Sequence, residues 1–443
     1  MSTINNKEEQ SKNPFSSLIR KEDWWAVWLG IILIIGALIG GISSPVLPER
    51  WGREGSFDLL TSISQENILG IIMTGIVAWV VFSLSVYFFK KDQFKKFVLS
   101  FPIMYLLSMV AYTIGNYNPL RHYGFNNVIW ALVIGLIISN VFGTPQFLKN
   151  VMRTELYIKT GLVLLGASIL FNRVLSLGAL GLGVAWFVTP VVIIVMYWFS
   201  QKVLKMKKER NMAITLVSAL SVCGVSAAIA TGSAAKAKKQ EISLAISISL
   251  IFTILMMIIM PFLIRLMGLS PAVGGAWIGG TVDATGAVVA ASTMLGDEAM
   301  EVASVIKMIQ NVLIGIVAFI IATIWASVYE KQEGEKRKVS IKEIWIRMPK
   351  FILGFIGASL IFSFLIPEAT VSDKLPIING YRQLFFTLAF VSIGLESNFK
   401  DMAKLVKGGK PLKLYLVGQS LNVVLTLIAA MIFFSGRFFP LPF

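Results

Sequence analysis

Long apolar runs separated by short polar loops repeat along almost the whole chain. Because about 20 apolar residues cross a bilayer as a helix, this pattern predicts an all-α, polytopic membrane protein with about thirteen transmembrane segments. The strongly apolar segments are Trp24–Ile42, Ile68–Phe89, Phe97–Tyr117, Asn127–Phe142, Gly161–Phe171, Leu177–Phe199, Ile242–Met267, Val302–Tyr329, Phe351–Ile366, Gln383–Leu395 and Leu412–Phe434.

Two further segments, residues 218–230 and 279–292, are only weakly apolar and are rich in Gly, Ala, Ser and Thr. Polar groups placed in lipid cost several kcal/mol each unless protein or trapped water satisfies them. We therefore expect both segments to be broken helices. Their non-helical parts, around Gly224 and Gly286, should lie in the middle of the membrane and face each other.

Composition and charge narrow the class of protein. The chain has 443 residues, is 56% hydrophobic and carries a formal net charge of +16. Its Lys and Arg residues lie in short loops, which the positive-inside rule explains better than nucleic-acid binding does. We expect an inner (plasma) membrane protein with a cytoplasmic N-terminus. This orientation places the strongly basic loops in the cytoplasm, except the loop around Lys236, Lys238 and Lys239. A broken seventh segment would account for that exception.

No pattern for a cofactor, a metal site or an enzyme is present. Cys223 and His122 are the only residues of their types, so zinc-type clusters are excluded. No phosphate-binding loop, dinucleotide fingerprint or hydrolase elbow occurs. We therefore expect neither an enzyme nor a cofactor.

Asp283 and Lys307 are the charged residues that stand out within apolar sequence. An ionisable group inside a membrane is by default a functional candidate, and we assign both residues to ion coupling, with Glu396 as a further candidate. Gln310 and Asn311 extend a polar stripe on the helical face of Lys307. The alternatives are a carboxylate that pairs structurally at a helix end and a lysine that snorkels to the interface.

The small-residue segments supply candidates for an anion site, since the freed amides and dipole end of an interrupted helix attract anions. The alternative is close helix packing through small residues. The predicted substrate-binding residues are Ser221, Cys223, Gly224, Ser226, Thr281, Thr285, Gly286, Gln310 and Asn311.

A faint internal repeat joins Leu165-Gly166-Ala-Ser-Ile-Leu-Phe171 to Ile393-Gly394-Leu-Glu-Ser-Asn-Phe399, which share a Gly and a Phe at equal spacing. The expected topology runs the two segments in opposite directions, as an inverted repeat requires.

Three stretches carry a family resemblance: Leu164-Leu-Gly-Ala-Ser168, Ser221-Val-Cys-Gly-Val-Ser-Ala-Ala228 and Gly275-Ala-Trp-Ile-Gly-Gly-Thr-Val-Asp283. They resemble the YeiH-like family of proposed sulfate exporters, which is related to the bile acid/sodium symporters and sodium/proton antiporters. The resemblance covers residues 127 to the C-terminus. It implies a transporter core (residues 124–443) of inverted repeats with crossing, discontinuous helices, preceded by an extension of about three helices (residues 1–123). This chain has Asp283, Ala284 and Gly286 where the family typically has a His-Glu pair and a Gln.

These observations predict a secondary transporter, and specifically an exporter, of a small anion such as sulfate or an organic sulfonate or carboxylate. The coupling ion would be H⁺ or Na⁺. The protein would lie in the lipid bilayer, and a homodimer is a candidate assembly. Two alternatives stay open: a cation/proton antiporter that uses Asp283 and Lys307, and a membrane-embedded enzyme or receptor.

Overall fold

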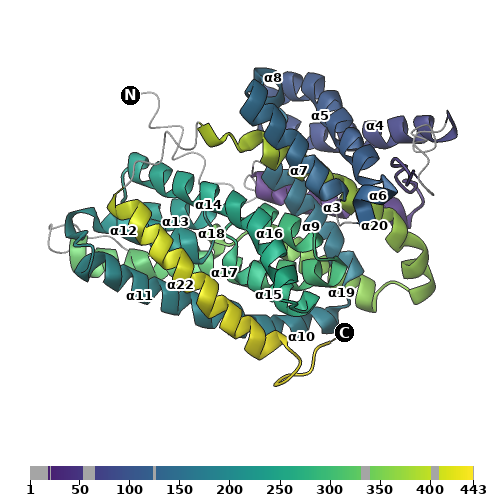
Figure 1. Cartoon of the computed structure of the whole chain (residues 1–443). Coiled ribbons are helices and arrows are strands. Elements are labelled where there is room, and N and C mark those ends of the chain that lie inside the picture. The colour runs from purple at the N-terminus through teal and green to yellow at the C-terminus, as the bar shows by residue number, and fades with distance from the viewer. Residues whose placement is uncertain are drawn as a thin grey trace. The chain divides into compact units, whose positions relative to one another are not determined.

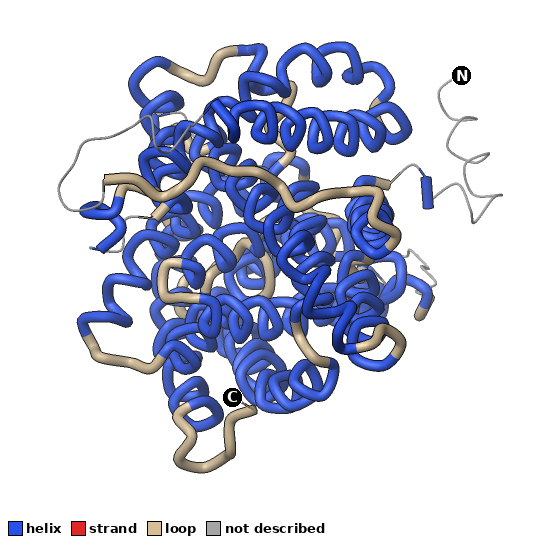
Figure 2. The backbone as a smooth tube through the Cα atoms, turned by 90° about the vertical axis from the view of Figure 1, so that its right-hand side faces the viewer, coloured by secondary structure: helices blue, strands red, loops and turns tan. Residues whose placement is uncertain are grey.

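The structure is a computed structural model that describes residues 18–19, 21–52, 65–122, 126–330, 340–400 and 409–442. In these ranges the regular secondary structure is helical, as Figures 1 and 2 show. Within the described residues, six helices are long and apolar enough to cross a membrane: Asn67–Phe89, Lys91–Gly115, Phe171–Lys202, Lys239–Leu266, Asp297–Tyr329 and Lys410–Phe434. The all-α, multi-pass membrane class is therefore confirmed.

Each predicted apolar range overlaps a helix, but several boundaries were wrong. Helix α9 begins at Thr154 and not near Gly161. Helix α20 begins at Glu368, which is 15 positions before the predicted start at Gln383, and it includes Pro376. The N-terminal half of α20 is polar, so a pattern of apolar residues does not reveal it as part of a helix. Thirteen crossings and inverted repeats stay predictions.

The chain divides into two compact units, each made of two separate stretches. Unit 1 comprises residues 1–171 and 350–396, and unit 2 comprises residues 172–349 and 397–443. These units are groups of helices that pack together in space. The predicted boundary after residue 123 separates an N-terminal extension from a transporter core, which is a different kind of division, and it stays a prediction.

Unit 1 packs its helices around an aromatic centre. Phe82 lies 4.7 Å, centroid to centroid, from both Tyr157 and Phe385, in edge-on contacts that join three helices. The helices of this unit are α3 (Glu22–Leu38), α4 (Gln65–Phe89), α5 (Phe94–Gly115), α6 (Asn118–His122), α7 (Asn127–Ile137), α8 (Gln146–Lys149), α9 (Thr154–Ser168), α19 (Phe351–Phe364) and α20 (Glu368–Glu396).

Unit 2 contains both small-residue segments. Its helices are α10 (Phe171–Leu182), α11 (Val188–Lys202), α12 (Arg210–Ser221), α13 (Ser226–Ala234), α14 (Lys239–Leu266), α15 (Pro271–Thr281), α16 (Thr285–Thr293), α17 (Asp297–Ile324), α18 (Lys342–Arg347) and α22 (Lys410–Phe434). Phe171, the first residue of α10, is counted with unit 1.

Glycines bring α15 unusually close to α17. A Cβ atom built on Gly275 would lie 2.4 Å from the carbonyl oxygen of Ala299, and one on Gly279 would lie 2.7 Å from that of Ala303. Small residues four positions apart let two helix backbones approach in this way. The contact fixes the C-terminal end of α15 next to the polar face of α17.

Candidate functional site

The two small-residue segments are both broken helices, and the two breaks touch. One break separates α12, which ends at Ser221, from α13, which begins at Ser226. The other separates α15, which ends at Thr281, from α16, which begins at Thr285. The backbone N–H of Gly224 donates to the carbonyl oxygen of Asp283 at 3.0 Å.

The position predicted for the second break was wrong by a few residues. Val282 and Ala284 have extended backbone angles and interrupt the helix, whereas Gly286 is the second residue of α16. The residues before Gly286 therefore supply the freed backbone groups. The depth of both breaks in the membrane stays a prediction.

Close approach explains why residue 224 is a glycine. A Cβ atom built there would lie 2.1 Å from Oγ of Ser249 and 3.4 Å from Cβ of Asp283. Real Cβ contacts are not this short, so any larger residue would push Ser249 away. Gly224 thus lets the first break lie directly against the carboxyl group of the second.

Asp283 is buried, with 2% of its surface exposed. Its Oδ2 accepts a hydrogen bond from Oγ of Ser249 at 2.8 Å and a second one from the hydroxyl of Tyr415. No described residue donates to its other oxygen, Oδ1. A buried carboxyl group of this kind keeps one oxygen open for a proton or another cation.

Lys307 is also buried, with 1% of its surface exposed, and its ammonium group bonds to neutral oxygens. Nζ donates to the carbonyl oxygen of Val222 at 2.8 Å and to Oε1 of Gln310 at 2.7 Å. Lys307 does not pair with Asp283: among the described residues, each of the two charges has other partners. Snorkelling to the interface is excluded as well, because the lysine points into the break.

Side-chain donors also occupy the other carbonyl groups at the C-terminal ends of α12 and α15. Gln310 donates through Nε2 to the carbonyl oxygens of Ser221 at 2.9 Å and Gly280 at 3.2 Å. Asn422 donates to Leu220 at 3.2 Å, and Gln419 donates to Thr281 at 3.1 Å. Donors on α17 and α22 therefore satisfy several of the free carbonyl groups at these two helix ends.

The N-terminal end of α16 lacks such partners. Its N-cap residue is Ala284, and no side chain caps the first turn, although that turn is buried. Buried helix ends normally find partners for their free amides. Next to this end, Asn311 donates to Oγ1 of Thr285 at 3.1 Å, while Oδ1 of Asn311 and Oγ1 of Thr281 have no partner among the described residues.

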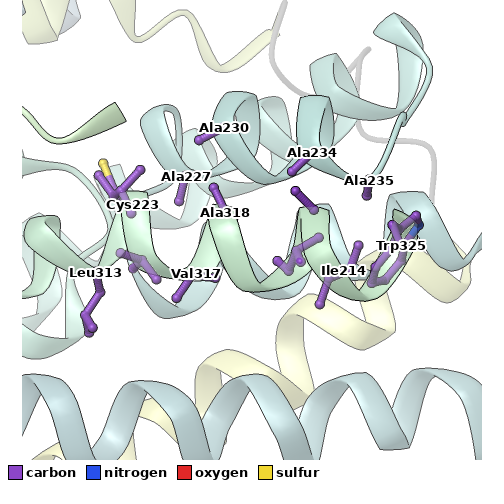
Figure 3. Packing of buried hydrophobic residues seen from close by; sticks show 14 residues of the cluster. Ile214, Cys223, Ala227, Ala230, Ala234, Ala235, Leu313, Val317, Ala318 and Trp325 are labelled. Atoms are coloured by element: carbon purple, nitrogen blue, oxygen red, sulfur yellow. The ribbon is translucent and has the colours of Figure 1, made fainter. Parts of the chain in front are cut away.

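Three predicted residues of the first segment have other surroundings. The hydroxyl of Ser221 donates to the carbonyl oxygen of Val217 in its own helix at 2.6 Å. Cys223 packs in an apolar cluster in which small residues of α13, such as Ala227, face Ala318 of α17 (Figure 3). Ser226 is exposed at the start of α13. Only Ser226 of these three offers a free hydroxyl.

Glu396 belongs to unit 1 and does not join Asp283 within one unit. It ends α20, where its Oε1 accepts hydrogen bonds from Oγ1 of Thr154 at 3.0 Å and Oγ of Ser392 at 3.5 Å.

Comparison with known proteins places the chain in a family. The family model described as "Conserved hypothetical protein 698" matches residues 99–415. The chain belongs to this family. Relatives carry the name UPF0324 membrane protein. The one from Rhodopirellula baltica is 49% identical over 88% of this chain and 72% of its own length, and one from Nitratidesulfovibrio vulgaris is 46% identical over 87% and 66%. No solved structure matches significantly.

Helix α22 contributes polar side chains to the site that were not predicted from the sequence of this UPF0324 family member. Tyr415, Gln419, Asn422 and Thr426 recur at intervals of three or four positions and are all buried. Such a polar stripe on one face of an apolar helix is a visible signal. Ser249 carried no comparable signal, because it is one of several serines in α14 and only its contact with the break distinguishes it.

Proposed function

We propose that this UPF0324 protein is a secondary active transporter of a small anion, coupled to protons through Asp283. The observation that carries the proposal is the contact of two helix breaks around a buried carboxyl group. Secondary transporters place their substrate and coupling-ion sites at discontinuous helices. Sulfate, organic sulfonates and organic carboxylates are the substrate candidates, and export is the proposed direction.

The free N-terminal end of α16 supports an anionic substrate. Its uncapped amides carry the positive end of the helix dipole, and such ends are ready-made anion sites. Thr281 and Asn311 place polar atoms beside it, and Thr285 begins the helix. These groups, with the exposed Ser226 of α13, form the proposed substrate contacts.

The occupied carbonyl ends favour H⁺ over Na⁺ as the coupling ion. Sodium at a broken helix is coordinated by unwound carbonyl groups and C-terminal helix ends. Here Lys307, Gln310, Gln419 and Asn422 already fill those positions. The ammonium of Lys307 thus takes the place of a bound cation, and the open Oδ1 of Asp283 is left for a proton. The same occupancy disfavours a cation as substrate.

We also infer an inverted repeat that relates α7 and α9 to α19 and α20. A Cβ atom on Gly166 of α9 would lie 2.2 Å from the carbonyl oxygen of Phe355 in α19. One on Gly394 of α20 would lie 2.5 Å from the carbonyl oxygen of Leu132 in α7. The two glycines that the sequence pattern pairs therefore make reciprocal contacts, as a two-fold axis would produce.

The test is transport by purified full-length protein in proteoliposomes. With labelled sulfate, sulfonate or carboxylate as substrate, a pH gradient should drive accumulation and a sodium gradient should not. Asp283→Asn keeps the size of the side chain and removes its proton. It should abolish gradient-driven accumulation and retain exchange of substrate across the membrane.

Asp297→Asn is the matched control, since Asp297 is an exposed acid at the start of α17. It should behave as wild type. Accumulation by Asp283→Asn with wild-type dependence on the pH gradient would place the coupling site elsewhere, with Glu396 as the next candidate. Proton flux that follows Na⁺ and needs no anion would instead favour the cation/proton antiporter.

A further inference from the structure

An apolar groove runs between α4 and α5 in unit 1. It consists of two adjoining cavities of about 480 Å³ and 310 Å³, and Trp79 lines both. Ile72 and Leu106 line the larger cavity, and Tyr87 and Phe94 line the smaller one. Its lining side chains are almost wholly apolar, so water is a poor occupant.

The smaller cavity ends at a basic turn. Lys90 and Lys91 lie in the turn between α4 and α5, and Lys95 and Lys96 follow in the first turn of α5, with Asp92 as the single acid among them. Nζ of Lys91 lies 5.5 Å from the centre of the Tyr87 ring, which itself lines the groove. A cation is therefore held at the mouth of the apolar cavity.

The groove has a length that suits one acyl chain. Val98 lines the smaller cavity and Met109 the larger. At 1.5 Å per residue these positions on α5 are about 17 Å apart. One leaflet of hydrocarbon is about 15 Å deep, half of the usual core. An extended chain that starts at the basic turn would thus follow the groove through one leaflet.

We propose that the groove is a binding site for one anionic phospholipid. Its acyl chain occupies the two cavities, and its phosphate lies against Lys91 and Lys95. The choice of an anionic lipid follows from charge complementarity: basic residues at the membrane surface attract anionic headgroups, whereas a zwitterionic lipid gains little from them. The site does not depend on the transport proposal, because it uses no residue of the two helix breaks.

The experiment measures lipid retention by the purified full-length protein with native mass spectrometry. The probes are phosphatidylglycerol and phosphatidylcholine with identical acyl chains. Wild type should retain phosphatidylglycerol in preference. Lys91→Gln combined with Lys95→Gln should reduce that preference by roughly thirtyfold, the effect of two basic residues near an anionic lipid. The matched control, Lys207→Gln with Lys208→Gln, removes two exposed lysines of another polar turn.

Filling the groove tests the acyl-chain part. Leu106→Trp should abolish retention of both lipids, and Ile72→Trp should do the same. Both positions are more than half exposed, so folding should survive. Leu99→Trp is the control, because Leu99 is exposed on α5 but does not line the groove. Phosphatidylglycerol with brominated acyl chains should quench the fluorescence of Trp79. The part of the quenching that is lost in Trp79→Phe measures this contribution.

Several results would overturn the proposal. Equal losses in the control lysine pair would show attraction to any basic surface. Unchanged retention in Leu106→Trp would place the lipid elsewhere, and full competition by glycerophosphoglycerol, which lacks acyl chains, would show a phosphate site only. Dissociation of an oligomer by Leu106→Trp would mean that a second copy covers the groove.

Discussion

Replacing Lys307 by Ala tests whether the ammonium group is a structural cation of the helix breaks. The change leaves two buried acceptors, the carbonyl oxygen of Val222 and Oε1 of Gln310, without the donor that now lies 2.8 Å and 2.7 Å away. Each unsatisfied acceptor costs about 1–3 kcal/mol, so the two together cost about 2–6 kcal/mol. Relief of the cost of burying the ammonium offsets part of this.

A net loss of about 2–4 kcal/mol is therefore expected for Lys307→Ala. At about 2–4 °C per kcal/mol, the midpoint of thermal unfolding should fall by roughly 4–16 °C. The assay is tryptophan fluorescence of purified protein during heating, in sodium chloride or in choline chloride at equal ionic strength. Sodium should raise the midpoint of Lys307→Ala, because the vacated space offers it the two oxygens, and should leave wild type unchanged.

Lys307→Met is the matched control, since its side chain fills the space with apolar atoms. It should be destabilised without recovery in sodium. A wild-type midpoint for Lys307→Ala would refute the structural role of the ammonium group. Specific stabilisation of wild type by sodium would show that the carbonyl ends are open to a cation, and it would remove the argument for proton coupling.

Three further substitutions test the geometry around the breaks. Gly224→Ala forces Ser249 away from Asp283 and should cost about 1–3 kcal/mol of stability, measured by thermal unfolding. Adding Ser249→Ala should restore part of this loss. An unchanged midpoint for Gly224→Ala would contradict the close approach. Tyr415→Phe removes a donor to Asp283, and because hydrogen bonds to charged acceptors are the stronger ones, its loss of stability should be larger at pH 8 than at pH 5. Ser226→Val should weaken anion affinity by about 1.5–3 kcal/mol if the hydroxyl contacts substrate, with unchanged stability because this side chain is exposed; equal affinity in a binding assay would remove Ser226 from the site.

Hydropathy and residue spacing could predict the helical class and the existence of both breaks, because each depends on local composition, but not the position of the second break, which lies before Gly286. The first segment, residues 218–230, is rich in Ser, Gly and Ala, which distinguishes it from an ordinary apolar span. The start of α20 could not be predicted in the same way. Its first half is polar, contains Pro376 and forms a helix through packing and backbone bonding that no hydropathy window detects.

The candidate site was predicted in part. Asp283 and Lys307 stand out because charge is rare in apolar sequence, yet their partners depend on tertiary contacts. Residue spacing does not show whether the two meet, and in the structure Lys307 bonds to Val222 whereas Asp283 bonds to Tyr415. Sequence spacing shows which residues share a helix face, but not which helix that face meets.

The donors that satisfy the first break have a consequence for biogenesis. The carbonyl groups of Leu220 and Val222 lie at the C-terminal end of α12, about halfway along the chain. Their side-chain partners follow 202 and 85 positions later, on α22 and α17. A nascent chain that ends before α17 leaves those groups unpaired at a cost of several kcal/mol each in lipid. The carbonyl groups of the first break therefore gain their full set of partners only after α22 has been inserted into the membrane.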